Sequence, residues 1–309
     1  MIRTRGLSNL HLVVRDLERS LRFYRDLVGL APLTHTSPSA AQDGSGFGFS
    51  GNARWDAWLL HDARGFTGPG LDLLEWQEPR PTGRPYAEAN HLGIFRLCLT
   101  APDLDAMHAR LAAAGVPCLS APVAVPIDPA AGLSVRFFCA RDPDGTTVEF
   151  VERPGPLRLL HANVNCRDLA RSAAWYRSLL GLEAIGRSSP GSVDGTGFAL
   201  PGEVDWRAEF LAVPGQPEPF VIDLLEWRTP RPVGRPYASA NCVGLFRLAF
   251  LVEDARACHA ELVRQGVETS PPVWLEMGPE VPIPGLFAVF FRDPDGTCLE
   301  LIQRPELAR

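Results

Sequence analysis

Short stretches of alternating apolar and polar residues open the chain. Residues 9–14 alternate as in a half-buried strand, and Asp16 after them is suited to the N-cap of a helix. One broad apolar helical face then follows and ends before Gly29; its residues are Leu17, Leu21, Phe23, Tyr24 and Leu27. Further strand-like stretches end in the sequence LDLLEW, at residues 71–76. The pattern predicts one strand, one helix and several more strands.

The same order of elements returns after a proline-rich segment. Residues 93–100 read as a strand, and residues 104–114 read as a helix that Gly115 closes. Two more strands are predicted at residues 133–139 and 146–151, with the tight-turn sequence DPDG between them. Each stretch therefore predicts a βαβββ module.

The chain is an internal repeat with an offset of about 151 residues. Residues 71–97 and 222–248 are identical at 19 of 27 positions. The same offset relates the two DPDG segments, and a similar one relates the two amino-terminal helix patterns. Pro154-Gly155-Pro156 interrupts any strand and forms the natural joint. We therefore expect two copies of one domain, at residues 1–153 and 157–309, with four βαβββ modules in all.

Composition excludes several function classes. The 309 residues are 46% hydrophobic and 21% charged, with a net charge of -6, which disfavours a nucleic-acid-binding surface. No apolar run reaches the length of a membrane span, so we expect a cytoplasmic protein with no membrane partner. All basic side chains are arginine, which excludes Schiff-base and Walker A chemistry. The seven cysteines lack CxxC spacing and are expected to be reduced.

Several motifs of the chain resemble those of the vicinal oxygen chelate superfamily, which includes glyoxalase I, extradiol dioxygenases and bleomycin-binding proteins. These motifs are DLERSLRFYRDLVGL, DLARSAAWYRSLLGL, DLDAMHARLAAAGV and the two endings that begin with DPDG. The resemblance implies an α+β fold in which paired βαβββ modules form two cups of strongly curved mixed sheet. Cups formed within each half and cups formed between the halves both remain open at this point.

The resemblance also implies four ligand positions in each cup, one from the first and one from the last strand of each module. In the first half these positions hold Asn9, Glu75, Arg96 and Glu149; in the second half they hold His161, Glu226, Arg247 and Glu300. The family commonly has His/Glu/His/Glu there. Arginine therefore stands at one ligand position in each half.

Arginine at a ligand position argues against a metal, because it stays protonated and cannot ligate. We expect Arg96 to lie between Glu75 and Glu149, and Arg247 between Glu226 and Glu300, with no cofactor. One interpretation is a buried ion network without chemistry. The other is a catalytic group in which arginine binds a substrate oxyanion and glutamate moves a proton.

Two histidines stand at or near the ligand positions. His161, Glu226 and Glu300 form the alternative set that would hold one divalent metal, Fe, Zn, Ni or Mn, in the second cup. His11 lies two residues after Asn9 on the same strand face and is a candidate acid or base. Its structural interpretation is a histidine bonded within the barrel wall.

Two asparagines, two tryptophans and two tyrosines are further candidates for substrate binding: Asn9, Asn163, Trp55, Trp206, Tyr86 and Tyr237. Trp55 is equivalent to Trp206 and Tyr86 to Tyr237, whereas Asn9 is equivalent to His161 and Asn163 to His11. The tryptophans would stack a flat ligand, or else belong to the core. The tyrosines belong to the segments PRPTGRPYAEAN and PRPVGRPYASAN, which would form either a lid over an anionic ligand or a strap between modules.

Three functions follow from these residues. The first is a metal-independent lyase, isomerase or cyclase acting on an anionic or aromatic metabolite, as found in bacterial secondary metabolism. The second is a protein that sequesters an antibiotic or a metabolite, and the third is a metal-dependent extradiol-type dioxygenase or glyoxalase using the second cup. The partner in each case is a small molecule, and the expected state is a monomer or homodimer.

Overall fold

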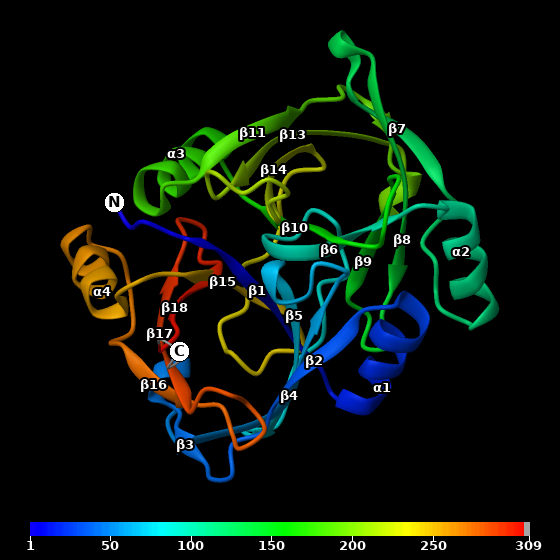
Figure 1. The fold of residues 1–309 in the computed structure, drawn as a ribbon. Coiled ribbons are helices and arrows are strands. Elements are labelled where there is room, and N and C mark those ends of the chain that lie inside the picture. Colours follow the sequence, from blue (N-terminus) through cyan, green and yellow to red (C-terminus); the bar gives the residue numbers. More distant parts are fainter. Residues whose placement is uncertain (306–309) are drawn as a thin grey trace.

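Two large curved sheets with helices on their outer faces make up the protein (Figure 1). The computed structural model describes residues 1–305. Four consecutive βαβββ modules, with one additional two-residue strand in the first and in the third, supply all the strands of the described residues, so the fold class predicted from the sequence is confirmed.

The bounds of the elements follow the module order. The first module contains β1 Gly6–Val13, α1 Leu17–Leu21, β2 Ala31–Thr36, β3 Gln42–Asp43, β4 Asn52–His61 and β5 Gly70–Glu78. The second contains β6 Gly93–Ala101, α2 Leu104–Ala113, β7 Val123–Asp128, β8 Leu133–Arg141 and β9 Thr147–Glu152. The third contains β10 Leu159–Asn165, α3 Leu169–Leu180, β11 Glu183–Ser188, β12 Val193–Asp194, β13 Glu203–Ala212 and β14 Val221–Thr229. The fourth contains β15 Gly244–Leu251, α4 Ala255–Arg264, β16 Val273–Glu276, β17 Gly285–Arg292 and β18 Cys298–Gln303.

An aspartate N-cap begins each of the four helices and fixes where the chain leaves the preceding strand. The side chain of Asp16, for example, accepts a hydrogen bond from the backbone N–H of Arg19. A π-helical segment, Arg22–Val28, continues α1 and ends at Gly29, whose φ of 102° favours glycine. The other caps are Asp103, Asp168 and Asp254.

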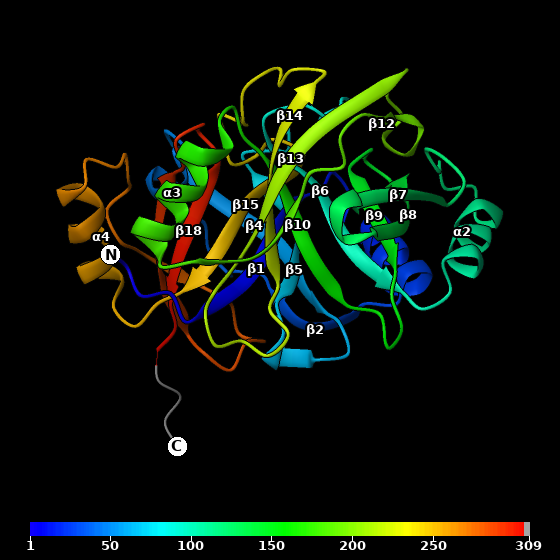
Figure 2. The same ribbon diagram turned by 90° about the horizontal axis from the view of Figure 1, so that it is seen from above.

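Each sheet takes one module from each half of the chain. The first module pairs with the fourth through antiparallel β1 and β15, and the second pairs with the third through antiparallel β6 and β10. We call the concave side of the sheet built from β1–β5 and β15–β18 cup A, and that of the sheet built from β6–β14 cup B. The structure therefore decides the question that the sequence left open, because the cups form between the halves (Figures 1 and 2).

Helices tie the modules of one half together across the two sheets. The hydroxyl of Tyr24, which follows α1, donates to Asp142 Oδ2 at 3.1 Å in the DPDG turn between β8 and β9. Tyr176 on α3 donates in the same way to Asp293 Oδ2 at 3.0 Å. The joint at residues 154–156 is exposed.

Three apolar clusters make up the core. The largest packs the helices against the outer faces of both sheets, and the other two fill the interior of cup A and of cup B. The interiors are centred on Trp76 and Trp227, which are both fully buried. Among residues 1–305, no helix is long and apolar enough to cross a membrane.

Candidate functional site

The floor of each cup carries the same five polar residue types. Cup A has Asn9, His11, Asp72, Arg247 and Glu300; cup B has His161, Asn163, Asp223, Arg96 and Glu149. The first strand of one cup reads Asn-x-His and that of the other reads His-x-Asn. Because alternate strand residues share a face, this exchange leaves both groups on the floor but reverses their places.

In cup B the arginine bridges two carboxylates. Arg96 Nε donates to Glu149 Oε2 at 2.9 Å, and its Nη2 donates to Asp223 Oδ2 at 3.1 Å. His161 Nε2 lies 3.1 Å from Glu149 Oε2 and 3.9 Å from Asp223 Oδ2. Asn163 Nδ2 donates to Asp223 Oδ2 at 3.1 Å. The buried floor is therefore one connected network.

The environment moves the pKa values of the two carboxyls of cup B in opposite directions. Burial raises the pKa of Asp223 above its ordinary value, although Arg96 and His161 act against it. Burial also acts to raise the pKa of Glu149, but Arg96 and His161 outweigh it and lower that pKa to about 2. Such a divergence between neighbouring carboxyls is typical of acid–base sites.

A cavity of about 320 Å³ opens above this floor. Arg96, Glu149, His161 and Asp223 supply the polar groups at its base, and Arg153 and Ser188 add polar groups to its wall. Most of its remaining wall is apolar and aromatic, including Val125, Ile127, Val135, Phe137, Phe198, Trp206 and Phe210. The space suits a small ligand that is largely apolar with one polar end.

In cup A the histidine, rather than the arginine, joins the two carboxylates. His11 Nδ1 lies 2.7 Å from Asp72 Oδ2, and His11 Nε2 lies 2.8 Å from Glu300 Oε2. Arg247 Nε donates to Glu300 Oε2 at 2.8 Å. The same five residue types are thus connected differently in the two cups.

The prediction that Arg96 and Arg247 lie between pairs of glutamates that include Glu75 and Glu226 is wrong. Glu75 Oε2 accepts the backbone N–H of Leu17, and Glu226 Oε2 accepts that of Leu169, so both carboxylates serve helix N-termini on the outer faces. Asp72 and Asp223 lie three residues earlier and therefore on the concave face.

The alternative metal set is not assembled either. His161 lies in cup B beside Glu149, Glu300 lies in cup A beside His11, and Glu226 faces α3. The prediction assigned these residues to one cup because they belong to the same half of the chain, whereas each cup draws on both halves.

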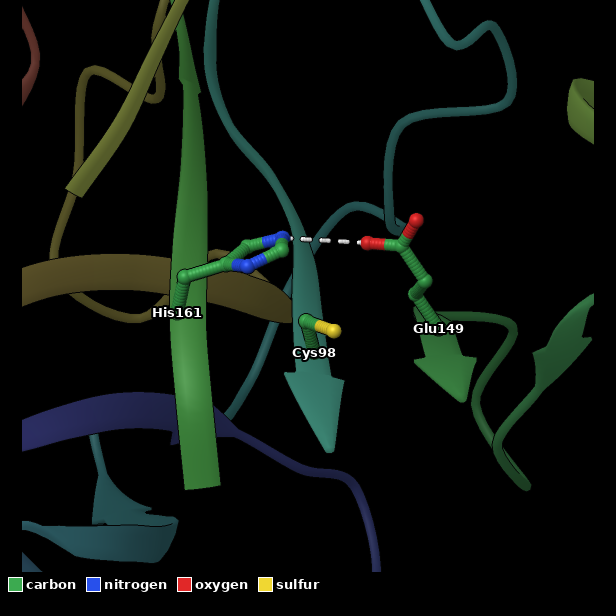
Figure 3. Close-up of side chains that lie close together, drawn as sticks. All are labelled: Cys98, Glu149 and His161. Carbon is green, nitrogen blue, oxygen red and sulfur yellow. Dashed lines mark hydrogen bonds and ion pairs between the residues drawn. The ribbon is translucent and has the colours of Figure 1, made fainter. Parts of the chain in front are cut away.

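A different group of metal-ligating side chains comes together in cup B. Donor atoms of Cys98, Glu149 and His161 lie within 4.8 Å of one another (Figure 3). The group does not fit a divalent metal, because Arg96 donates to the same Glu149 oxygen that contacts His161, and its charge would repel the ion. Burial raises the pKa of the Cys98 thiol well above its ordinary value, which disfavours the thiolate that a metal needs.

Not all of the aromatic candidates lie at the cavity. Trp206 lines the cup B cavity, whereas Trp55 packs within the core of cup A against Trp76. Tyr86 and Tyr237 stack on each other at 4.1 Å, and the Tyr86 hydroxyl accepts the backbone N–H of Tyr237 at 2.8 Å. The structure therefore joins the two tyrosines as a strap between the halves.

The two asparagines serve their neighbours on the cup floors. Asn9 Nδ2 lies 2.8 Å from His11 Nε2, and Asn163 Nδ2 donates to Asp223. Each therefore contributes to the polar network beside the histidine or the aspartate.

Sequence reasoning missed Asp72, Asp223 and Cys98. The strands β5 and β14 are apolar on both faces, so the pattern LDLLEW gives no clear alternation to distinguish Asp from Glu. The tryptophan that ends each motif could have identified the aspartates. Trp76 and Trp227 lie four positions after Asp72 and Asp223, and residues four apart in a strand share a face.

Comparisons with known proteins agree with this architecture. The model of the Glyoxalase/Bleomycin resistance protein/Dioxygenase superfamily matches residues 6–150 and 158–301. Glyoxalase I from Zea mays has a TM-score of 0.65 and 17% identity, covering 96% of this chain and 92% of that one. A Bacillus subtilis protein provisionally assigned as a dioxygenase has a TM-score of 0.63 and 15% identity, covering 99% and 87%.

These two structural likenesses show the fold alone, because the identities are low. A search of the curated proteins gave no match to this chain. The family match covers both repeats and nearly all of the strands of both cups. The chain therefore belongs to the Glyoxalase/Bleomycin resistance protein/Dioxygenase superfamily.

Proposed function

We propose that cup B is the active site of a metal-independent enzyme of the lyase, isomerase or cyclase kind. The observation that carries the proposal is the buried network of Arg96, Glu149, His161 and Asp223 at the base of an otherwise apolar cavity. Such a network has an acid, a base and a cation within reach of one bound molecule.

The substrate we propose is a small aromatic or polyketide-like metabolite. The aromatic walls of the cavity would pack against a flat ring system, with Trp206 among them. Arg96 pairs with Glu149 and Asp223, whose carboxylates would repel a carboxylate group of a ligand at the floor, while its buried Nη1 is left without a partner among the described residues. A carbonyl or phenol oxygen is the better match.

Proton transfer is the chemistry that this floor supports. Asp223, whose pKa burial raises above its ordinary value, would accept a proton from the substrate more readily than an ordinary aspartate. His161 Nε2 lies between the two carboxylates and would carry the proton between them. The Arg96 guanidinium would stabilise negative charge that develops on a substrate oxygen, as a metal does in other chemistries of this kind.

A second function, sequestration of a small molecule, is favoured by the apolar character of the cup B cavity. Binding of this kind needs the aromatic wall but no proton transfer, so the network would then serve only the fold. The isosteric change Asp223→Asn distinguishes the two functions, because it should impair proton transfer but not binding.

The test compares wild type with Asp223→Asn and the matched cup A variant Asp72→Asn. Each is dialysed against EDTA and incubated in D₂O with phenols, cyclic ketones and 1,3-diketones, while NMR and mass spectrometry follow deuterium uptake and product. We expect turnover that Asp223→Asn lowers by about 10²–10⁴-fold and that Asp72→Asn leaves largely intact.

Each other outcome contradicts the proposal in its own way. Calorimetric binding without turnover would establish sequestration. Turnover that appears only after a divalent ion is restored would establish a metal-dependent enzyme. Equal loss in both aspartate variants would remove cup B as the single site of the reaction.

A further inference from the structure

Cup A has a cavity of its own, at the other end of its floor. Its volume is about 220 Å³, and its wall includes Phe47, Phe246, Arg247, Phe290 and Arg292. It reaches Arg247 beside Cys298, the first residue of β18. The cup B cavity, in contrast, follows β9 from Glu149 to Val151 and on to Arg153 beyond its end. The two arginines are therefore approached from opposite ends of equivalent strands.

Arg247 keeps more of its guanidinium donors free than Arg96, whose Nη2 is bonded to Asp223 and whose buried Nη1 alone lacks a partner among the described residues. Both guanidiniums are buried, with only 4% of each residue exposed. Arg96 donates to two carboxylates, but Arg247 is joined to Glu300 through Nε alone. Within the described residues, 1–305, the two Nη groups of Arg247 have no hydrogen-bond partner, and the residue lines the cavity.

The rest of the cavity wall adds positive charge and aromatic surface. Arg292 donates only to backbone carbonyls, those of Tyr237, Ala238 and Gly296, so no carboxylate neutralises it within the described part of the chain. The rings of Phe47 and Phe290 lie 5.6 Å and 5.1 Å from the Arg247 guanidinium carbon. The one acidic residue on the wall, Glu268, is exposed.

From this geometry we infer that the cup A cavity is a binding site for a small aromatic monocarboxylate. The carboxylate oxygens accept hydrogen bonds from the Nη groups of Arg247, and the ring lies against Phe47, Phe246 and Phe290. A single negative charge suits the site, because a dianion would be repelled by the adjacent Glu300. This site is separate from cup B and does not depend on the function proposed there.

The test uses 4-bromobenzoate and its neutral isostere 4-bromobenzamide as probes of the full-length protein. Calorimetry is expected to show the carboxylate binding at least about tenfold more tightly than the amide, because a charge-assisted bidentate contact is lost in the amide. In crystals soaked with 4-bromobenzoate, the anomalous signal of bromine is expected in the cup A cavity.

Two matched tryptophan variants locate the site in solution. Ala238 lines the cup A cavity and is exposed, and Ala87 holds the equivalent place in the other half without lining the cup B cavity. Ala238→Trp should block the cavity and lower the affinity for 4-bromobenzoate at least about tenfold, whereas Ala87→Trp should leave it unchanged.

Several results would overturn the inference. These are equal affinity for the two probes, a bromine signal only in cup B or nowhere, and unchanged binding in Ala238→Trp. If Ala238→Trp fails to fold, the soaked wild-type crystal decides, because the position of the bromine does not depend on any variant.

Discussion

The two cups show how one set of residue types can be arranged into two different sites. In cup B, Arg96 bridges Glu149 and Asp223, and the histidine lies beside them under an open apolar cavity. In cup A, His11 bridges Asp72 and Glu300, which leaves the outer donors of Arg247 turned to a different cavity. The exchange of Asn and His on the first strand is the change in sequence that accompanies this rearrangement.

The two cups also differ in the residue that lies next to the arginine. Phe290 in cup A takes the place that Cys139 holds in cup B, and its ring packs on Arg247. A bulky aromatic there fills space beside the guanidinium and contributes a cation–π contact. The two cups thus share their buried charges, and the residues around those charges differ between them.

Separating the halves should have the largest effect on the comparison. A fragment of residues 1–153 contains β1 and β6 without their partners β15 and β10, so each sheet loses its central pair. We expect no folded monomer, because both unpaired edges would be exposed. Sedimentation should find aggregate or a dimer in which β1 of one copy pairs with β6 of another. A folded, monomeric fragment would show that the pairing between halves is not needed for the fold.

Removing the arginines should distinguish the two networks energetically. Arg96→Ala leaves two buried carboxylates facing each other and should cost about 3–5 kcal/mol of unfolding free energy. Arg247→Ala leaves Glu300 still paired with His11 and should cost less, about 2 kcal/mol. Urea denaturation measures both, and Arg96→Lys tests whether a fork geometry is required.

Two results of the urea denaturation would contradict this prediction. A loss of under about 1 kcal/mol in both alanine variants would place these groups in the range of exposed ion pairs. An equal loss in both would mean that the second carboxylate of cup B adds nothing.

Replacing arginine by histidine tests why a metal does not fit. Arg96→His removes the charge and adds an imidazole beside His161, Glu149 and Asp223, so we expect about one zinc, nickel, cobalt or iron ion per chain. The metal set expected from the sequence, His161, Glu226 and Glu300, would place this gain at Arg247→His instead, but Glu226 faces α3. Arg247→His should gain less, because His11, Asp72 and Glu300 do not line the cup A cavity through which an ion would enter.

Metal analysis after dialysis compares the three proteins. Stoichiometric metal in wild type would contradict the metal-independent proposal. A well-folded Arg96→His variant without metal would mean that its four side chains do not converge in solution.

The smallest effect concerns the pH dependence of cup A. Burial and Arg247 act to lower the pKa of His11, but Glu300 and Asp72 outweigh them and raise it above its ordinary value of 6.5. The stabilisation is therefore complete below pH 6.5 and is lost as the pH rises through the raised value. His11→Asn, which copies the residue at the equivalent position of cup B, should remove this slope. Denaturation of both proteins at several pH values on either side of 6.5 measures it, and an unchanged slope would assign it to another group.

The repeat, the module order and most element boundaries were determined by the sequence itself. Periodicity predicted residues 93–100 as a strand and 104–114 as a helix, and the structure has β6 at Gly93–Ala101 and α2 at Leu104–Ala113. These are local properties, set by apolar spacing, aspartate caps and glycine stops within a few residues of each element. The sequence likewise predicted that Arg96 and Arg247 are buried charges, although it did not identify all of their partners.

Only the tertiary structure decided which partners those charges have. Pairing between modules joins the two chain ends into cup A, and no local pattern encodes which of two near-identical edges a strand will choose. In β5 and β14 both faces are buried, so the sequence pattern does not distinguish them. Pairing with β1 and β10 leaves Glu75 and Glu226 facing the helices and Asp72 and Asp223 on the floors. The site residues thus follow from a pairing over long distances in the chain, where packing and not local preference sets the register.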